Sequence, residues 1–318
     1  MVCSINEGLF SVISIIIVNW NSGQQLRTCV ESVIKFSNNL VNKIIVVDNG
    51  SIDGSEIGIE NLSGVMLIRA GENLGFGKAC NLGAKQADSE WLLFLNPDAA
   101  LYSNTLLKAL SFMQNLTNDK VGICSVQLLD EKGHVSRSCA RFPSAAGFTA
   151  HAIGLDRLLP ELGHFMAEWD HSTVRYVDQV MGAFFLVRHE LFEVLNGFDE
   201  QFFVYFEEVD FSYRAHQAGW KSIYLTEAQA FHAGGGTSNQ VKARRLFYSL
   251  RSRLLYARKH FSLAGMFFVL LATLLIEPLS RLLLALARRS WSGFKETCLA
   301  YVMLWRWLPQ LLFKKIHG

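Results

Sequence analysis

An aspartate follows a buried strand in the segment WLLFLNPD, residues 91–98. Five apolar residues precede Asn96, Pro97 and Asp98, and a proline stiffens the turn that carries the carboxylate. A carboxylate in this position is a hard oxygen ligand of the kind that Mg²⁺ and Mn²⁺ prefer. The alternative is a turn-forming or helix-capping aspartate, because Asn-Pro-Asp is also good turn chemistry.

Three acids crowd together in YFEEVDFSYR, residues 205–214. A helix that begins near Glu207 places Glu207, Asp210 and Arg214 on neighbouring faces and leaves Glu208 pointing elsewhere. A partly desolvated carboxylate in this segment is a candidate general base. Acids in a first helical turn also gain from the helix dipole, which is the structural alternative.

Two further residues are candidates for a phosphate or a metal. Lys78 follows Gly75 and Gly77 in NLGFGKACNLG, where it meets a phosphate at a helix N-terminus or is a solvated first-turn lysine. Cys80 stands where a dinucleotide fingerprint has its third glycine, so that fingerprint matches poorly, and no P-loop occurs. His232 follows a predicted strand and precedes three glycines, which suggests a ligand or a mobile active-site loop.

The elements that position these residues alternate over the first 130 residues. Apolar runs near residues 12–18, 43–48, 64–70 and 91–95 are separated by helical patterns, including residues 24–36. This alternation predicts a parallel sheet with both faces covered. Ligands of such sheets bind beyond the carboxyl ends of the strands, where polar residues follow the runs: Asn19, Asn21, Asp48, Asn49, Asn96 and Asp98.

The second half of this region is less regular. We expect loops and short strands beside the site over residues 131–180, then a strand over 182–187 and a helix over 190–195. A turn at Asn196-Gly197 precedes the acidic helix, and a strand follows over residues 222–225.

Charge divides the 318-residue chain into two predicted domains. Residues 1–241 carry 16 Lys and Arg against 26 Asp and Glu, a net charge of −10, whereas residues 242–318 carry 14 against 2, a net charge of +12. The total of +2 does not suggest a nucleic-acid binder, and half of the residues are hydrophobic. The basic, apolar tail favours an anionic membrane surface as its partner.

The tail is predicted to form interfacial helices. Its uncharged run from Phe261 to Ile276 is shorter than the roughly 20 residues of a spanning helix, and Glu277-Pro278 interrupts it. Glu277 and Arg281 are one turn apart and are expected to pair. Basic flanks and a second amphipathic stretch, residues 301–315, favour helices that lie in the headgroup layer, with a buried helical hairpin as the alternative.

Six scattered cysteines support neither a zinc site nor a disulfide framework, because no C-x-x-C pair or Cys/His cluster occurs. We expect reduced, mostly buried thiols in the cytosol. The first apolar run lacks a basic flank and ends in Asn-Trp-Asn, so no signal peptide is expected.

Taken in order, the segments IIIVNWNS, IIVVDNGSIDGS, NLGFGKACNLG, LLFLNPDA, GAFFLVR and GFDEQFFVYFEEVDFSYRAHQAGW resemble family 2 glycosyltransferases, and most of all their rhamnosyltransferase-like branch. The resemblance covers about residues 10–240. It implies the GT-A fold, a nucleotide-sugar-binding α/β fold with a mostly parallel central sheet, followed here by C-terminal amphipathic helices. It also implies a divalent metal, Mg²⁺ or Mn²⁺, and inversion at the anomeric carbon.

The resemblance assigns the donor site and the metal by position. Asp48 resembles the acid that contacts the base, and Asn96 stands where the family's D-x-D motif often has its first Asp. Asp98 keeps the metal-ligand role, and His232 resembles the histidine that completes the metal site. The nucleotide-sugar-binding residues are then Asn19, Asn21, Asp48, Lys78, Asn81 and Asn96.

The catalytic base falls on Glu208, the second position of the family's Glu-Asp pair. That position is commonly Asp, so the longer side chain leaves the base open between Glu208 and Asp210. Gly182, Glu207 and Arg214 lie on the acceptor side.

The expected reaction is transfer of a sugar to a polyprenyl-diphosphate-linked or other cell-surface glycan acceptor in O-antigen or cell-wall polysaccharide synthesis. It takes place at the cytoplasmic face of the inner membrane. L-rhamnose from dTDP-rhamnose is the first choice of donor, followed by UDP-galactofuranose and UDP-hexoses. A metal-dependent nucleotidyltransferase and a non-catalytic membrane scaffold are the alternatives. The former should show a Gly-rich, basic signature where this chain has NWNSGQQ, and the latter leaves the acids unexplained.

Overall fold

The computed structural model describes residues 12–166, 168–234 and 242–313. The chain divides into two compact units. The first, here called the sheet unit, comprises Met1–Ala140, Trp169–Glu200 and Glu207–Gly236. The second, the helical unit, comprises Arg141–Glu168, Gln201–Phe206 and Thr237–Gly318.

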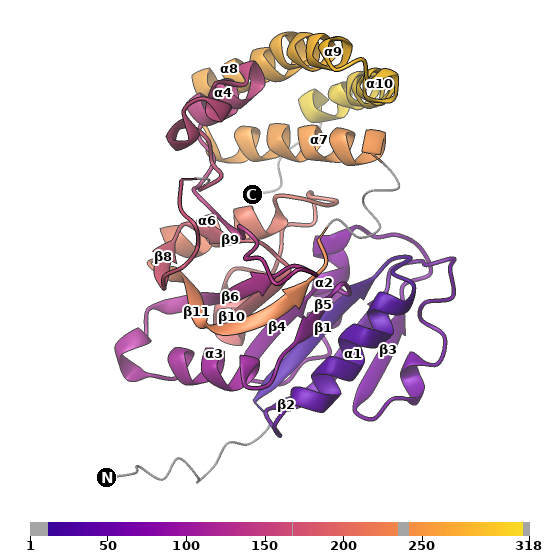
Figure 1. Cartoon of the computed structure of the whole chain (residues 1–318), viewed down its shortest axis with the longest axis vertical. Helices are drawn as coiled ribbons and strands as arrows, with labels where there is room; N and C mark the ends of the chain where they lie inside the picture. Colours follow the sequence, from indigo (N-terminus) through magenta and orange to yellow (C-terminus); the bar gives the residue numbers. More distant parts are fainter. Residues whose placement is uncertain (1–11, 167, 235–241, 314–318) are drawn as a thin grey trace. The chain divides into compact units, whose positions relative to one another are not determined.

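The sheet unit is built on a mixed, mostly parallel sheet (Figure 1). Its described strands follow the order β3-β2-β1-β4-β10-β6-β11-β5, and β8 pairs with β11. β10 is antiparallel to β4 and β6, and β5 and β8 are antiparallel to β11, whereas the other neighbours are parallel. The strands are β1 (Ile13–Asn19), β2 (Val41–Asp48), β3 (Val65–Arg69), β4 (Trp91–Leu95), β5 (Ala99–Leu101), β6 (Val121–Leu129), β8 (Arg175–Val177), β10 (Phe184–Arg188) and β11 (Lys221–His232). The predicted α/β class is confirmed.

Helices cover both faces of this sheet because its strands are apolar on both sides. On one face, Ile13, Ile15 and Ile17 join a buried core with α1 (Gln24–Phe36) and α3 (Thr105–Met113). On the other, α2 (Phe76–Ala84) approaches β1 so closely that a Cβ at Gly83 would lie 2.6 Å from Cγ2 of Ile16. Clustered phenylalanines join α5 (His189–Val194) and α6 (Glu207–Gln217) to the sheet.

Most predicted elements of this unit occur where the sequence placed them. α1 has the predicted bounds, residues 24–36, and α6 begins at the predicted Glu207. Asn196 and Gly197 form the predicted turn with left-handed backbone. β11 extends to His232, well beyond the predicted residues 222–225. Over residues 131–180, the prediction of loops and short strands missed a helix, α4 (Ala145–Ile153), although the short strands β7 (Cys139–Ala140) and β9 (Gln179–Val180) do occur.

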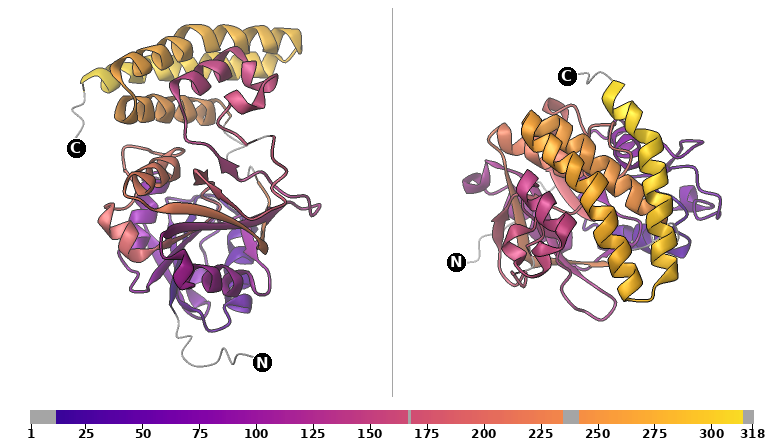
Figure 2. Two further views of the ribbon diagram at one scale, coloured as in Figure 1. Left: turned by 90° about the vertical axis from the view of Figure 1, so that its left-hand side faces the viewer. Right: turned by 90° about the horizontal axis from the view of Figure 1, so that it is seen from above.

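The helical unit contains α4 together with four helical stretches of the C-terminal region (Figure 2). These are α7 (Lys242–His260), α8 (Leu263–Leu271), α9 (Glu277–Ala287) and α10 (Trp291–Phe313). α7 packs against α8 and α10, α10 packs against α9, and α4 packs against α8 and α9. Residues 141–168 therefore belong with the C-terminal helices, although they precede much of the sheet unit in the chain.

The apolar helix of this unit is longer than its sequence suggests. A π-helical segment, Ala272–Ile276, joins α8 to α9 without a break, so one helix runs from Leu263 to Ala287. The uncharged run ends at Glu277-Pro278, as predicted, but the helix continues, because Pro278 lies in the first turn of α9 and the π-helical segment accommodates the change in hydrogen bonding. Among the described residues, this helix is long and apolar enough to cross a membrane by length and composition.

Candidate active site

The carboxyl ends of β1 and β2 carry a network of amide, carboxylate and hydroxyl groups. Asn19 and Asp48 are register partners in the parallel pair. The Asn19 Nδ2 group lies 3.0 Å from Asp48 Oδ1, 3.0 Å from Ser51 Oγ and 2.8 Å from Ser55 Oγ, within hydrogen-bonding distance of each. Asn19 and Asp48 are both buried. The network fixes the loop that follows β2 at the sheet edge where a nucleotide is expected.

Asn21 holds the same loop from the other side. Its backbone N–H donates to Ser51 Oγ at 3.0 Å, and its Oδ1 accepts from the Ile52 N–H at 2.8 Å. The backbone of Asn21 is left-handed, with φ of 51°, a conformation that asparagine tolerates better than most residues. Three of the predicted donor-site residues, Asn19, Asn21 and Asp48, thus lie together at this edge.

Asn49 joins this edge to the glycine-rich turn, a role that the sequence analysis did not assign. Its Oδ1 accepts from the Leu74 N–H at 2.8 Å, and its Nδ2 donates to Asn73 Oδ1 at 3.1 Å. Gly50 makes this approach possible, because a Cβ there would lie 2.8 Å from the carbonyl carbon of Glu72. The Asp-Asn-Gly triplet at a strand end was the available signal.

The two predicted residues on α2 have different surroundings. Lys78 is exposed in the first turn of the helix, where a phosphate can reach it. Asn81 is buried; its Nδ2 donates to the Phe198 carbonyl at 2.8 Å, and its Oδ1 accepts from the Phe198 N–H at 2.9 Å. Nδ2 also lies 3.2 Å from Glu200 Oε1. Asn81 therefore fastens the 197–200 segment to α2, and its contact with a ribose or diphosphate stays a prediction.

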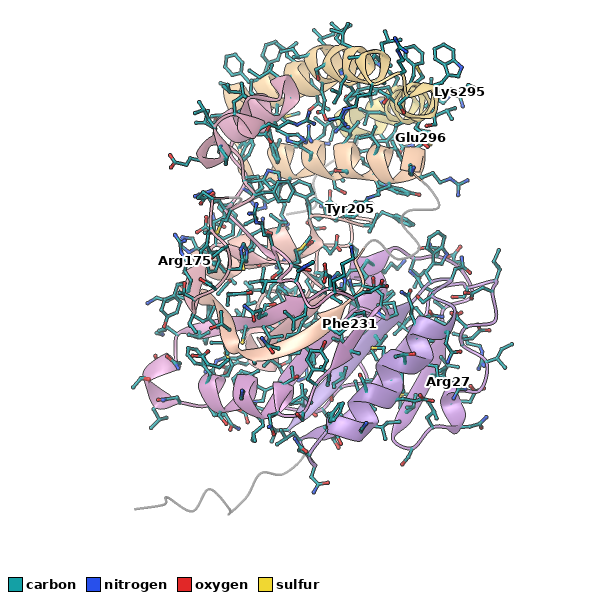
Figure 3. All side chains as sticks on the ribbon, in the orientation of Figure 1. Arg27, Arg175, Tyr205, Phe231, Lys295 and Glu296 are labelled. Atoms are coloured by element: carbon teal, nitrogen blue, oxygen red, sulfur yellow. The ribbon has the colours of Figure 1, made fainter. Side chains whose placement is uncertain are left out.

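The predicted metal ligands Asp98 and His232 lie side by side. Antiparallel pairing of β5 with β11 sets His232 opposite Ala99, and the Ala233 N–H donates to the Asp98 carbonyl at 3.1 Å. His232 Nε2 is 3.4 Å from Asp98 Oδ1, and the two side chains are 14% and 11% exposed. β11 is visible in Figure 3 through the labelled Phe231, the residue before His232. Two residues far apart in sequence thus form one polar pair.

This pair fits a divalent cation as part of a ligand set. A carboxylate oxygen and an imidazole nitrogen suit Mn²⁺, and the carboxylate suits Mg²⁺. Within the described parts of the chain, no group of three or more His, Cys, Asp and Glu side chains is arranged to hold a metal. A cation held by Asp98 and His232 would therefore need further oxygen ligands from outside this pair. Asn96 lies two residues before Asp98, and its backbone N–H donates to the Ala183 carbonyl at 3.1 Å.

Glu207, at the start of α6, is a buried acid in an apolar position. It is 4% exposed, and among the described residues its Oε2 has no hydrogen-bond partner. A Cβ at Gly77 would lie 3.3 Å from the Glu207 Cβ, closer than most Cβ contacts, so glycine favours the close approach of α2 and α6. Burial, together with the charge of Glu208, raises the pKa of the Glu207 carboxyl well above its usual range. Glu207 is therefore suited to remain protonated.

Asp210 is committed to an ion pair inside the sheet unit. Its side chain is fully buried, and Arg214 Nε donates to its Oδ2 at 2.8 Å. The same guanidinium donates to the carbonyls of Leu195 and Gly197, the latter at 2.8 Å. Arg214 thus ties α6 to the turn after α5, and its predicted contact with the acceptor stays a prediction.

Glu208 is the one acid of this segment that is only half-buried. Its neighbours Glu207 and Asp210 are buried, one in an apolar position and one in an ion pair. The chain enters this turn through Tyr205 and Phe206, both left-handed with φ of 66° and 72°. Two consecutive bulky residues in this conformation are strained, and strain of this kind gathers at functional sites. Of the two candidates for the base, Glu208 is the less buried, and its catalytic role stays a prediction. Gly182, the remaining predicted residue, precedes β10 and lies near the Phe76 ring.

Comparison with known proteins shows what this region is similar to. Residues 14–144 match the sequence profile described as Glycosyl transferase family 2. The chain is 28% identical over 236 residues to N-acetylglucosaminyl-diphospho-decaprenol L-rhamnosyltransferase of Mycobacterium tuberculosis, covering 70% of this chain and 76% of the relative. It is also 28% identical over 229 residues to the rhamnosyltransferase WbbL of Escherichia coli K12, covering 68% of this chain and 83% of the relative.

Solved structures show the same fold. The mannosyltransferase PcManGT of Pyrobaculum calidifontis, in complex with GDP-Man and Mn²⁺, superposes with a TM-score of 0.57 at 15% identity, over 93% of this chain and 87% of that one. Residues 1–349 of TarS from S. aureus give a TM-score of 0.51 at 16% identity, over 94% and 91% of the two chains. The predicted GT-A-like architecture with C-terminal helices is therefore confirmed.

Proposed function

We propose that this protein is a family 2 glycosyltransferase, as the match of residues 14–144 to that family profile indicates, and that it transfers L-rhamnose from dTDP-rhamnose to a lipid-linked glycan acceptor. The named activity of the two rhamnosyltransferase relatives supports the choice of sugar. The decaprenyl diphosphate in the name of the M. tuberculosis relative supports the class of acceptor. The basic, apolar tail supports transfer at the cytoplasmic face of the membrane, where such an acceptor resides.

One observation carries the catalytic part of this proposal: the 3.4 Å pair of Asp98 and His232 at the end of β11. A divalent cation bound by these residues would neutralise charge that develops on the leaving nucleoside diphosphate. Lys78, exposed at the N-terminus of α2, adds a positive charge for the same phosphates. Asn19, Asn21 and Asp48 shape the edge of the sheet where the nucleoside binds.

Glu208 acts as the general base in the proposed reaction. Its carboxylate takes the proton of an acceptor hydroxyl while that oxygen forms a bond to the anomeric carbon of the sugar. The bond from this carbon to the diphosphate breaks in the same displacement, so the configuration inverts and the nucleoside diphosphate leaves. Burial and the charge of Glu208 raise the pKa of Glu207, which favours its neutral form, and Asp210 is paired with Arg214.

A panel of nucleotide sugars tests the donor, with release of nucleoside diphosphate as the readout. dTDP-rhamnose should be the best substrate, and its turnover should require the lipid-linked acceptor and a divalent cation. Asp98→Ala should abolish transfer, and EDTA should do the same to the wild type. Asp119→Ala, a matched change of an exposed aspartate, should leave transfer intact.

Other outcomes of the panel identify the alternatives. Preference for UDP-galactofuranose or a UDP-hexose would replace the donor and keep the mechanism. Release of pyrophosphate from a nucleoside triphosphate would indicate a nucleotidyltransferase. Full activity in EDTA would overturn the metal role of Asp98 and His232.

A further inference from the structure

The helix Leu263–Ala287 exposes an apolar face along its whole length. Its exposed large side chains are all hydrophobic and are between 39% and 88% accessible to solvent. At 1.5 Å per residue, the helix is about 37 Å long. Such an extended apolar face is far larger than the isolated hydrophobic residues of an ordinary protein surface. The face comprises Leu263, Phe267, Phe268, Leu275, Ile276, Leu279, Leu283 and Leu286.

The acidic residue of the same helix, Glu277, lies inside the helical unit. Glu277 is 2% exposed and forms ion pairs with Arg253 of α7 and with Arg281 one turn away. The expected Glu277–Arg281 pair is therefore confirmed, with Arg253, itself 6% exposed, as a second partner. Thr273 is also buried. A water-exposed helix has the opposite polarity, with its charged face outward, so this arrangement is suited to an apolar environment outside the protein.

A second segment extends the apolar surface. Between the end of α4 and residue 165, five large hydrophobic side chains are 45% to 80% exposed. This segment belongs to the helical unit, and the Ser280 hydroxyl of α9 donates to the Ala152 carbonyl of α4 at 2.8 Å. No membrane role was predicted for this part of the chain. The exposed side chains are Ile153, Leu158, Leu159, Leu162 and Phe165.

The net charge of the helical unit indicates which partner covers its apolar surface. The helical unit carries 16 Lys and Arg against 5 Asp and Glu, a net charge of +11. Exposed Arg288, Arg289 and Lys295 lie at the junction of α9 and α10, beside the exposed Trp291, and Figure 3 labels Lys295 and Glu296 at the start of α10. Tryptophan and basic side chains are typical of the membrane interface. A second copy of this chain would bring like charges together, whereas an anionic bilayer complements them.

The packing of α7 indicates whether the helix Leu263–Ala287 docks on a membrane or crosses it. α7 carries seven Lys and Arg residues and no Asp or Glu. It packs against α8 and α10, and Figure 2 shows these helices in adjacent layers of the helical unit. A helix with so many charges does not enter the hydrocarbon core without a large cost. Because α8 is packed on α7, the helix Leu263–Ala287 is suited to lie along the membrane surface.

We propose that the apolar face of α8–α9 and the 153–165 segment form one docking surface for an anionic lipid bilayer, with the helix Leu263–Ala287 parallel to the membrane plane. This inference deepens the proposed function, because it names the surface that brings the enzyme to a lipid-linked acceptor. The apolar side chains enter the boundary between headgroups and acyl chains, and the basic residues bind lipid phosphates.

Flotation with vesicles tests the surface in the full-length protein. We expect binding to vesicles of phosphatidylethanolamine and phosphatidylglycerol, with weaker binding to phosphatidylcholine and only partial release in high salt. Leu279→Asp/Leu283→Asp should reduce binding about a hundredfold or more, because two leucines no longer enter the apolar phase. Leu158→Asp/Leu162→Asp should also reduce it. The matched control, Ile52→Asp/Leu116→Asp, changes two side chains of the sheet unit that are 93% and 91% exposed, and it should bind as the wild type does.

Depth measurements test the orientation. Single cysteines replace Phe267, Leu275 or Leu283 in a Cys3→Ser/Cys298→Ser background and carry a fluorophore that is quenched by lipids labelled at known depth. An in-plane helix gives the same depth at all three positions. A crossing helix would spread positions 267 and 283 over about 24 Å along the membrane normal, and that result would overturn the proposed orientation.

The remaining outcomes separate this inference from the proposed function. Unchanged flotation of both aspartate variants would overturn the docking surface. A concentration-dependent dimer that the same variants abolish, without vesicle binding by the wild type, would identify a second copy as the occupant and would also contradict the proposal. Transfer to a water-soluble acceptor analogue should persist in all docking variants. Its absence in the wild type would count against the proposed function alone.

Discussion

The substitution Asp210→Asn tests whether Asp210 stabilises the fold or acts as the catalytic base. Asp210 is fully buried and accepts a hydrogen bond from Arg214 Nε at 2.8 Å. Asparagine keeps the shape of the side chain and removes its charge. The guanidinium of Arg214, 18% exposed, then remains largely buried without its counter-ion. We therefore expect this variant to lose stability around α6 before it loses any chemistry.

The size of the loss follows from the surroundings of the pair. Removal of one partner from a buried ion pair costs about 3–5 kcal/mol. Arg214 keeps its hydrogen bonds to the carbonyls of Leu195 and Gly197 and has some access to water, which favours the lower end. A loss of about 3 kcal/mol is roughly a hundredfold shift in the local unfolding equilibrium. It is also a large part of the about 5–15 kcal/mol that stabilises a typical domain.

Native-state hydrogen exchange is the suitable assay, because a chain with two compact units need not unfold in one step. Amides of α6 and of residues 195–200 should lose protection together, while α1 amides serve as the internal control. A double-mutant cycle with Arg214→Met isolates the interaction between the two side chains, and its coupling free energy should be about 2 kcal/mol. Coupling below about 0.5 kcal/mol would refute the reasoning. So would an Asp210→Asn variant that is fully protected yet inactive, which would move the catalytic base to Asp210.

Two further predictions concern the packing around α2 and α6. The raised pKa of Glu207 means that the folded state favours the neutral form of this carboxyl. The stabilisation that the neutral carboxyl provides is therefore complete below its ordinary pKa of 4.5 and is lost as the pH rises through its raised pKa. In thermal unfolding, Glu207→Gln should therefore have the same Tm as the wild type at acid pH and an increasingly higher Tm as the pH rises. The control variant, Glu131→Gln at an exposed position, should show no pH-dependent difference in Tm from the wild type. A Tm difference between Glu207→Gln and the wild type that decreases with rising pH would contradict the raised pKa of Glu207. Gly83→Ala should lower the free energy of opening of α2, measured by hydrogen exchange, by about 1–3 kcal/mol. The reason is that the new Cβ would lie 2.6 Å from Cγ2 of Ile16 and 3.1 Å from Cγ2 of Val47. Unchanged protection of the α2 amides would contradict this prediction and show that α2 can shift to make room.

The strands of the sheet unit were predictable because they are continuous apolar runs that end in polar residues. β1 and β4 are fully buried, as a parallel sheet covered on both faces requires. The edge where Asn19 and Asp48 meet follows directly, since parallel strands end on the same side. α4 was missed because its sequence, AAGFTAHAI, has small residues and no clear apolar stripe.

The interaction partners of the site residues were harder to predict from the sequence than the elements on which these residues lie. The spacing of Asp210 and Arg214 allows an ion pair, but only the tertiary structure shows that the pair forms and that Asp210 is fully buried in it. The resemblance to family 2 glycosyltransferases supplied the link between Asp98 and His232, which no local pattern encodes. The continuation of the helix through Glu277 and Pro278 was not predicted, because the uncharged run ends there and its pattern does not indicate a π-helical segment. Helical period alone also could not show that Glu277 lies inside the unit with Arg253.

The most direct test of the proposed chemistry is a comparison of transfer and donor binding in Glu208→Gln. With dTDP-rhamnose and a lipid-linked acceptor, the variant should transfer at least about a hundredfold more slowly, because the base can no longer take the proton. Its donor Kd should stay unchanged, and Glu131→Gln should behave as the wild type does. Transfer within a few-fold of the wild-type rate would contradict the assignment of Glu208 as the catalytic base.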